Sequence, residues 1–209
     1  MGKTILALLT DGYGGYGGIA NYVRDSLSAI AADPRIDRII AVHLLPPCPG
    51  DPRPAKVDLY HGKGRLGYAF RVLQLLATEK IDAVWISHIA LAPFACLSSK
   101  PVALVLHGTE AWGSTALERW AARRVTQIVP VSQFTWDRFA DLADCHQLKP
   151  LIAPGMVDLD HYQPGEADPA CLDRLAIKPG QHNLLCLARM GEDYEDKVFE
   201  RLISWASEG

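Results

Sequence analysis

The sequence lacks the features that mark membrane-spanning, disulfide-stapled or nucleic-acid-binding proteins. Its longest apolar run, residues 89–97, is interrupted by Pro93 and is too short to span a bilayer. The formal net charge of −3 gives no general attraction to nucleic acid. The five cysteines form no C-x-x-C pair, which favours reduced thiols over a disulfide framework or a zinc site. Because we also find no signal peptide, these absences predict a cytoplasmic protein.

A glycine-rich stretch, Asp11–Val23, is the most distinctive segment of the chain. It follows the apolar run Ile5–Leu9 and precedes apolar residues at helical spacing: Ile19, Tyr22, Val23, Leu27 and Ile30. The pattern predicts a strand, a turn over residues 11–20, and a helix with Gly17 and Gly18 at its amino end. Such glycines let the backbone approach a ligand, and the unpaired N–H groups of the first helical turn attract phosphate. The alternative is that Gly14, Gly15, Gly17 and Gly18 only form a flexible connection.

The 209 residues, 49% of them hydrophobic, alternate buried strands with helices. We expect six strands, at Ile5–Leu9, Arg38–Leu45, Ala83–Ser87, Pro101–Leu106, Gln127–Val131 and Leu151–Ala153. Helices are expected after the glycine loop, over 67–80, 88–97 and 117–124, and after a cap at Ser132; Lys56–Leu66 is too mixed to assign. The order predicts an α/β, Rossmann-like, doubly wound parallel sheet in residues 1–165. A linker and the first βα unit of an incomplete second domain, with its strand at Asn183–Ala188, are expected in residues 166–209.

The apolar strand Pro101–Leu106 ends at the polar cluster His107-Gly-Thr-Glu110. In open α/β sheets ligands bind beyond the carboxyl ends of the strands, so His107 is a candidate site residue, expected near the glycine loop. The alternative is a hydrogen-bonded structural histidine.

Five segments in this order resemble the group-1, family-4 glycosyltransferases of the GT-B fold. They are Gly17–Val23, His107–Trp112, Pro130–Ser132, Ile152–Asp158 and Leu187–Gly191. The resemblance spans residues 4 to about 194 and implies the N-terminal half of that fold with a stub of the second domain. In that family two Rossmann-like domains face each other across a cleft. The first largely holds the acceptor and the second holds the nucleotide-sugar.

The resemblance implies roles for four residues in a sugar transfer that retains anomeric configuration. Gly17 and Gly18 approach the donor diphosphate. His107 positions and polarises the donor sugar without acting as a nucleophile. Arg189 neutralises the leaving diphosphate, where negative charge develops in the transition state. The sequence departs from the family where Glu195-Asp196 follows Tyr194 in place of a lysine-glycine pair, and the family's downstream pair of glutamates has no counterpart.

The expected partners are a nucleotide-sugar, such as a UDP- or GDP-sugar, and a sugar or lipid-linked acceptor, with no cofactor and no nucleic acid. Asp158-Leu-Asp160 spells a D-x-D metal motif of another glycosyltransferase fold, but it lies in the stretch that resembles this family's interdomain loop, which argues against a metal. The cluster Arg119, Arg123 and Arg124 either meets an anionic lipid at the inner membrane face or is solvated, which the pattern favours. Trp112, Trp120 and Trp136 are expected to pack in the fold.

Two further expectations concern the end of the chain. The short chain should not transfer sugar by itself, because a GT-B site is assembled from two domains. An apolar helical face is expected to pack on the first domain or to form a homodimer; it consists of Val198, Phe199, Leu202, Ile203 and Trp205. Two other classes remain open: a non-catalytic nucleotide-binding or interaction module, and a Rossmann dehydrogenase or epimerase. The second is disfavoured, since no acidic residue closes the strand 38–45 to hold a ribose.

Overall fold

The computed structural model describes residues 2–48, 50–160, 162–178, 180, 183 and 203–205. The chain divides into two compact units, Met1–Val157 and Asp158–Gly209. The division expected at 165/166 stays a prediction.

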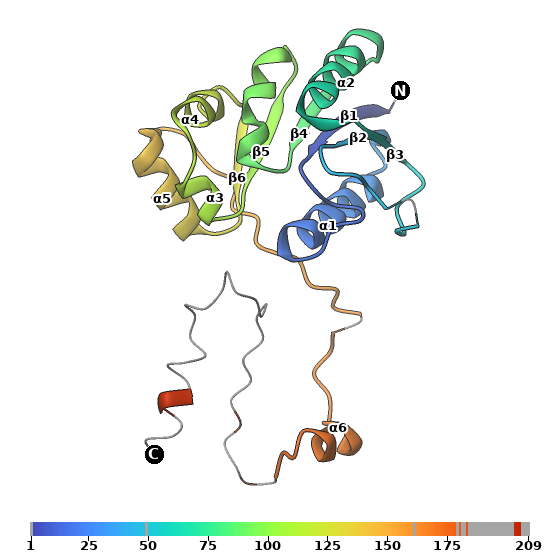
Figure 1. The fold of residues 1–209 in the computed structure, drawn as a ribbon, viewed down its shortest axis with the longest axis vertical. Coiled ribbons are helices and arrows are strands. Elements are labelled where there is room, and N and C mark those ends of the chain that lie inside the picture. The colour runs from blue at the N-terminus through green and yellow to red at the C-terminus, as the bar shows by residue number, and fades with distance from the viewer. Residues whose placement is uncertain are drawn as a thin grey trace. The chain divides into compact units, whose positions relative to one another are not determined.

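The first unit is built on a six-stranded parallel sheet with the order β3-β2-β1-β4-β5-β6 (Figure 1). The strands are β1 Lys3–Leu9, β2 Ile36–His43, β3 Val57–His61, β4 Ala83–Ile86, β5 Val102–Leu106 and β6 Gln127–Pro130. Strands β2 and β3 are added on one side of β1, and β4, β5 and β6 on the other. The change of side between β1 and β4 creates the switch point typical of doubly wound sheets. The expected Rossmann-like α/β fold is confirmed.

The helices that connect the strands are α1 Gly18–Ala32, α2 Gly64–Thr78, the 3₁₀ helix η1 Ile89–Leu97, α3 Thr109–Trp112, α4 Ala116–Ala122 and α5 Gln133–Ala143. Alternate residues of β1 face opposite sides of the sheet: Leu6 and Leu8 join one hydrophobic core, and Ala7 and Leu9 join another. The first core is completed by α2, η1, α4 and α5, and the second by α1. Because both faces are covered, each central strand is a continuous apolar run.

One strand assignment from the sequence is wrong, and one strand lies in a segment that the sequence did not assign, although the expected number of six is right. The mixed segment 56–66 contains β3, which lies at the edge beside β2 and is only half-buried after Val57. Its polar residues Asp58 and His61 hid the apolar pattern. Leu151–Ala153 is not a strand, but the N–H groups of Leu151 and Ala153 donate to carbonyls of β6 at 2.9 and 3.0 Å.

Other boundaries agree with the sequence. Pro130 ends the edge strand β6, where its missing N–H does no harm. The Ser132 hydroxyl caps α5 by accepting a hydrogen bond from the Thr135 N–H at 3.0 Å. In the second unit, α6 Pro169–Arg174 is capped by the Asp168 carboxylate.

The remaining expectations for the second unit lie mostly outside the described residues. These include Arg189, the strand expected from 183 to 188 apart from Asn183, and the apolar face apart from Ile203 and Trp205. Within the part of the chain that the structure describes, no helix has the length and apolar character needed to cross a membrane.

Candidate functional site

The glycine loop runs from Thr10 to Gly17, between the carboxyl end of β1 and the start of α1. Gly14 and Gly17 have φ values of 100° and 106°, which side chains adopt rarely. A Cβ atom at Gly15 would collide with the Asp11 carboxylate. At Gly18 a Cβ atom would meet nothing within 4 Å. Three glycines therefore shape the loop, and Gly18 leaves an open approach to the helix end. The placement of Gly17 and Gly18 at the amino end of the helix is confirmed, and the turn ends at Gly17, three residues earlier than expected.

The amino end of α1 has no side-chain cap and no acidic residue in its first turn. Its first helical hydrogen bond runs from the Asn21 N–H to the Gly17 carbonyl at 3.0 Å. The N–H groups of residues 18–20 precede that bond, so they and the helix dipole are available to an anion. This geometry suits the phosphate site expected from the sequence.

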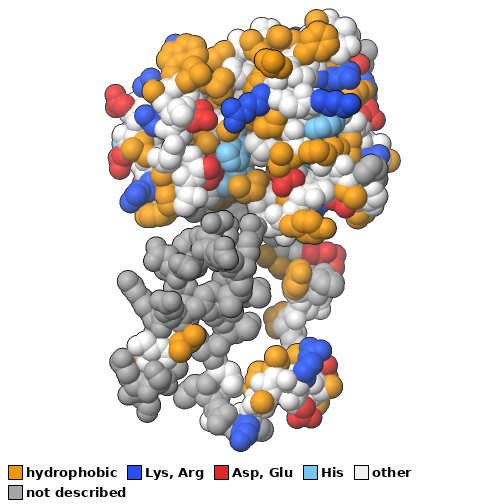
Figure 2. Space-filling view, in the orientation of Figure 1, with side chains coloured by type: hydrophobic (Ala, Val, Ile, Leu, Met, Phe, Trp, Pro, Cys, Tyr) orange, Lys and Arg blue, Asp and Glu red, His pale blue; other side chains and the backbone are white. Residues whose placement is uncertain are grey.

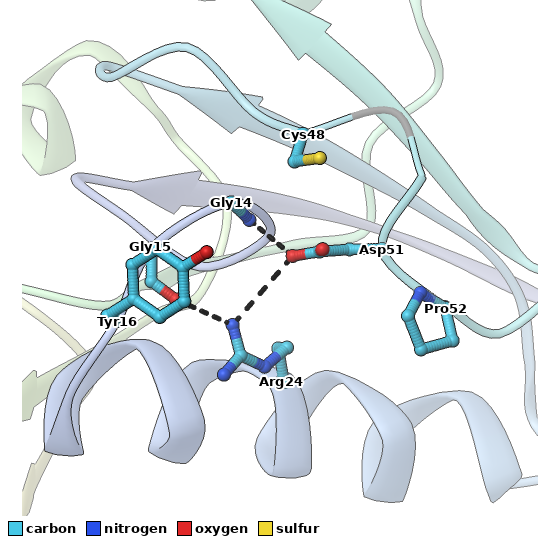
Figure 3. Close-up of a pocket in the computed structure, with 7 residues that line it drawn as sticks. All are labelled: Gly14, Gly15, Tyr16, Arg24, Cys48, Asp51 and Pro52. Atoms are coloured by element: carbon cyan, nitrogen blue, oxygen red, sulfur yellow. Dashed lines mark hydrogen bonds and ion pairs between the residues drawn. The ribbon is translucent and has the colours of Figure 1, made fainter.

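Arg24 and Asp51 hold the glycine loop in place (Figure 3). The Arg24 guanidinium, on α1, donates to the carbonyls of Gly12 and Gly15 at 2.7 and 3.0 Å. The Asp51 carboxylate accepts from the Gly14 N–H at 2.5 Å and lies 4.0 Å from Arg24. The loop is therefore fixed from both sides, by a helix and by the proline-rich segment after β2.

These two residues border a cavity of about 320 Å³ at the tip of the loop. Figure 3 shows its lining residues, which are Gly14, Gly15, Tyr16, Arg24, Cys48, Asp51 and Pro52. Sequence reasoning missed the roles of Arg24 and Asp51. Neither has a local signal, because they meet only when the segment after β2 folds back over the loop.

His107 directly follows β5, at the same carboxyl edge of the sheet. Its Nε2 donates to the Ser87 carbonyl at 2.8 Å, since a carbonyl can only accept. Its backbone N–H donates to the Glu110 carboxylate at 2.5 Å. Gly108, which follows His107 in the chain, has a φ of 142° and makes the sharp turn into α3. The polar cluster expected from the sequence is thus a tight turn that fixes His107.

Burial lowers the pKa of His107 below its ordinary value, although the Ser87 carbonyl and the Glu110 carboxylate act in the opposite direction. At neutral pH the ring is therefore uncharged, with its proton on Nε2. Nδ1 is left as a hydrogen-bond acceptor, and it has no partner among the described residues. His107 in this form can accept a hydrogen bond from a hydroxyl.

His107 and the amino end of α1 line one cavity of about 320 Å³. Its lining residues are Gly18, Ile19, Asn21, Tyr22, Asp25, His107, Val131, Gly155 and Met156. The structure thus brings together two of the four predicted site residues, with Gly17 next to Gly18 in the chain. Whether Gly17, Gly18, His107 and Arg189 bind ligand stays a prediction.

The other residues singled out from the sequence have structural partners. Arg119 and Arg123 donate to the carbonyls of Ser114 and Ala143, and Arg124 lies 3.7 Å above the Trp120 ring. The other two tryptophans pack in the fold: Trp136 is buried, and Trp112 meets Phe134 edge to face. At Asp158 the carboxylate accepts from the Asp160 N–H at 3.0 Å. Among the described residues, no three His, Cys, Asp or Glu side chains gather into a group able to hold a metal ion.

A comparison with protein-family models identifies a related family. The model described as Glycosyltransferase Family 4 matches residues 16–161, from the end of the glycine loop to just beyond the first unit. The matched stretch includes Gly17, Gly18 and His107 and leaves out Arg189. No curated protein matches the chain.

Proposed function

Since this chain belongs to glycosyltransferase family 4, we propose that its first unit is the acceptor-side half of an enzyme that transfers a sugar from a nucleotide-sugar to an acceptor. One observation carries the proposal. Gly18, at the uncapped end of α1, and His107, at the end of β5, line the same cavity. An anion site and a neutral hydrogen-bond acceptor beside each other fit a sugar diphosphate, which is charged at one end and hydroxylated at the other.

The α1 terminus would hold the diphosphate. When the bond between the anomeric carbon and the phosphate oxygen breaks, both electrons stay on the diphosphate and its negative charge grows. Fixed N–H groups and a helix dipole stabilise that charge without reorganising. We propose that Arg189, for which the family resemblance implies contact with the leaving diphosphate, would supply a full positive charge there.

His107 would hold the donor sugar. Its Nε2 is occupied by Ser87, so Nδ1 is the nitrogen that can accept a hydrogen bond from a sugar hydroxyl. This role orients the anomeric carbon towards the acceptor and requires no covalent intermediate on the histidine. We propose transfer with retention of anomeric configuration, as the family resemblance implies. Asn21 and Asp25, which line the same cavity, offer an amide and a carboxylate to acceptor hydroxyls.

A transfer assay tests the proposal. The purified chain is incubated with labelled UDP- and GDP-sugars and with sugar or lipid-linked acceptors, alone and together with a family donor-binding domain produced separately. Products are identified by mass spectrometry, and the anomeric proton coupling in the first product is read by NMR. A retained configuration is expected. An inverted product would refute retention. Failure to form product together with the donor-binding domain, or failure to bind any nucleotide diphosphate, would refute the proposed function, whereas the chain alone is expected to form no product.

A further inference from the structure

Helix α2 is apolar on two opposite faces. Tyr68, Val72 and Leu75 are at most 4% exposed and pack in the core. Leu66, Phe70 and Leu73 are 88, 70 and 49% exposed. At about 100° per residue these three share one stripe, turned away from the core face. A helix with apolar residues on two opposite faces is normally covered on both of them, so the outer stripe is suited to a partner.

The charges around this stripe are all of one sign. Residues 62–78 contain Lys63, Arg65 and Arg71 and no acidic residue. Lys63 and Arg65 stand at the amino end of α2, which has no side-chain cap. Cations are unfavourable at that end of a helix dipole, so Lys63 and Arg65 do not stabilise the helix. Arg71 and Arg65 lie on either side of the apolar stripe.

The position of α2 relates this surface to the candidate site. The helix begins three residues after β3 ends, so its amino end lies at the carboxyl edge of the sheet, as the glycine loop and His107 do. Figure 2 shows hydrophobic side chains over the part of the surface that α2 occupies in Figure 1, with Lys and Arg side chains beside them.

We propose that the outer stripe of α2, with Lys63, Arg65 and Arg71, docks on an anionic lipid bilayer. An interfacial helix buries a row of apolar side chains at the boundary of the acyl chains while its basic residues meet lipid phosphates. A second copy of this chain would offer the same positive charges and repel them. The cluster at 119–124 is a weaker candidate, since Arg119 and Arg123 are bonded to backbone carbonyls and the acidic Glu118 precedes them. On α2, Arg71 donates to the exposed Gln74 side chain at 3.1 Å and lies 5.7 Å from the centre of the Tyr60 ring. If the proposed sugar transfer holds, the docking would present the site to a membrane-borne acceptor.

Vesicle flotation of the 209-residue chain tests this surface. The two vesicle types are pure phosphatidylcholine and a mixture with about 30% phosphatidylglycerol, a fraction that gives a clearly negative surface. Binding to the mixed vesicles and little binding to the neutral ones is expected. The pair Leu66→Ser and Phe70→Ser should weaken binding at least about tenfold, because two apolar side chains no longer enter the interface. The matched control, Leu117→Ser with Leu142→Ser, removes two exposed leucines elsewhere and should bind as the wild type does.

The basic residues are tested in the same way. Lys63→Gln with Arg65→Gln should lower affinity for anionic vesicles by roughly tenfold or more, while Lys100→Gln with Lys149→Gln, which also removes two positive charges, should lower it far less. Circular dichroism and thermal melting confirm that each variant folds. Equal effects of test and control pairs, or no binding to anionic vesicles, would overturn the proposal. So would concentration-dependent dimers that the α2 substitutions abolish. Nucleotide-diphosphate binding measured without vesicles reports on the proposed function separately.

Discussion

The ring of Tyr22 meets the ring of His107 edge to face, with the two centroids 5.0 Å apart. The Tyr22 hydroxyl donates to the Ala153 carbonyl at 3.1 Å. Since Tyr22 lies about one helical turn beyond Gly18, a single turn of α1 carries the open helix end, supports the histidine and ties down the segment that leads to Gly155. The cavity walls are therefore connected through one side chain.

Replacing Tyr22 by Phe should separate the role of the ring, which contacts His107, from the role of the hydroxyl, which binds Ala153. The ring contact with His107 stays, while the hydrogen bond to Ala153 is lost, which should lower the free energy of unfolding by about 1 kcal/mol. Nucleotide-diphosphate affinity should change little. Chemical denaturation and isothermal titration measure the two quantities. A large loss of affinity with unchanged stability would show that the hydroxyl touches the ligand instead.

Replacing His107 by Ala should leave the fold intact and lower turnover in the assembled two-domain enzyme by roughly a hundredfold, the effect of losing one positioned polar group. In titrations of the chain, the affinity for a nucleotide-sugar should fall more than the affinity for the bare nucleotide diphosphate. His146, an exposed histidine paired with Asp141 at 2.8 Å, provides the control: His146→Ala should change neither quantity. Unchanged turnover in His107→Ala would make the histidine structural.

The sequence predicts the positions of Gly18 and His107 because both follow apolar strands, and parallel strands bring their carboxyl ends to one edge. It does not predict what fixes them. Ser87 contributes a backbone carbonyl, which any residue carries, and Asp51 reaches Gly14 across 37 positions of chain. The edge strand β3 was missed for a related reason: a strand covered on one side only needs fewer apolar residues to mark it.

Gly18→Ala should leave the fold intact but weaken binding of UDP, GDP and inorganic pyrophosphate. The new Cβ atom meets no protein atom within 4 Å, so any effect comes from space that a ligand occupies. Alanine also favours a helix by about 1 kcal/mol over glycine. Gly17→Ala is the contrasting variant, since a φ of 106° strains alanine and should lower the melting temperature. Titration calorimetry measures the pyrophosphate affinity of both variants. A Gly18→Ala variant that binds pyrophosphate as the wild type does would contradict the phosphate site.

Asp51→Asn should loosen the glycine loop more than it destabilises the domain. The substitution removes the charge that faces Arg24 and weakens the bond to the Gly14 N–H. Because both side chains are about 30% exposed, their ion pair contributes little to global stability. We expect faster amide hydrogen exchange across residues 11–18 and weaker nucleotide binding at a nearly unchanged melting temperature. Asp137→Asn, on the exposed face of α5, is the control. Unaltered exchange in Asp51→Asn would show that Arg24 alone holds the loop.

His43 should make the stability of the first unit depend on pH. The side chain is fully buried at the end of β2, and neither ring nitrogen has a hydrogen-bond partner among the described residues. Burial lowers the pKa of His43 from 6.5 to about 4, with the Asp11 carboxylate acting in the opposite direction and His61 adding to the shift. In the unfolded chain the His43 ring therefore becomes protonated near pH 6.5, whereas in the folded protein it becomes protonated only near pH 4.

Stability should accordingly be constant with respect to this group above pH 6.5 and fall as the pH drops towards 4, by roughly 3 kcal/mol in total. His43→Leu removes the titrating group and the two unpaired nitrogens at similar volume, so its unfolding free energy should vary less between pH 7 and 5 and should not be lower at pH 7. Urea denaturation across this range measures the difference, with the exposed His146→Gln as the control. If His43→Leu kept the full pH dependence of the wild type, another histidine, such as the partly buried His88 or His107, would have to be its source, since partial burial lowers their pKa values too.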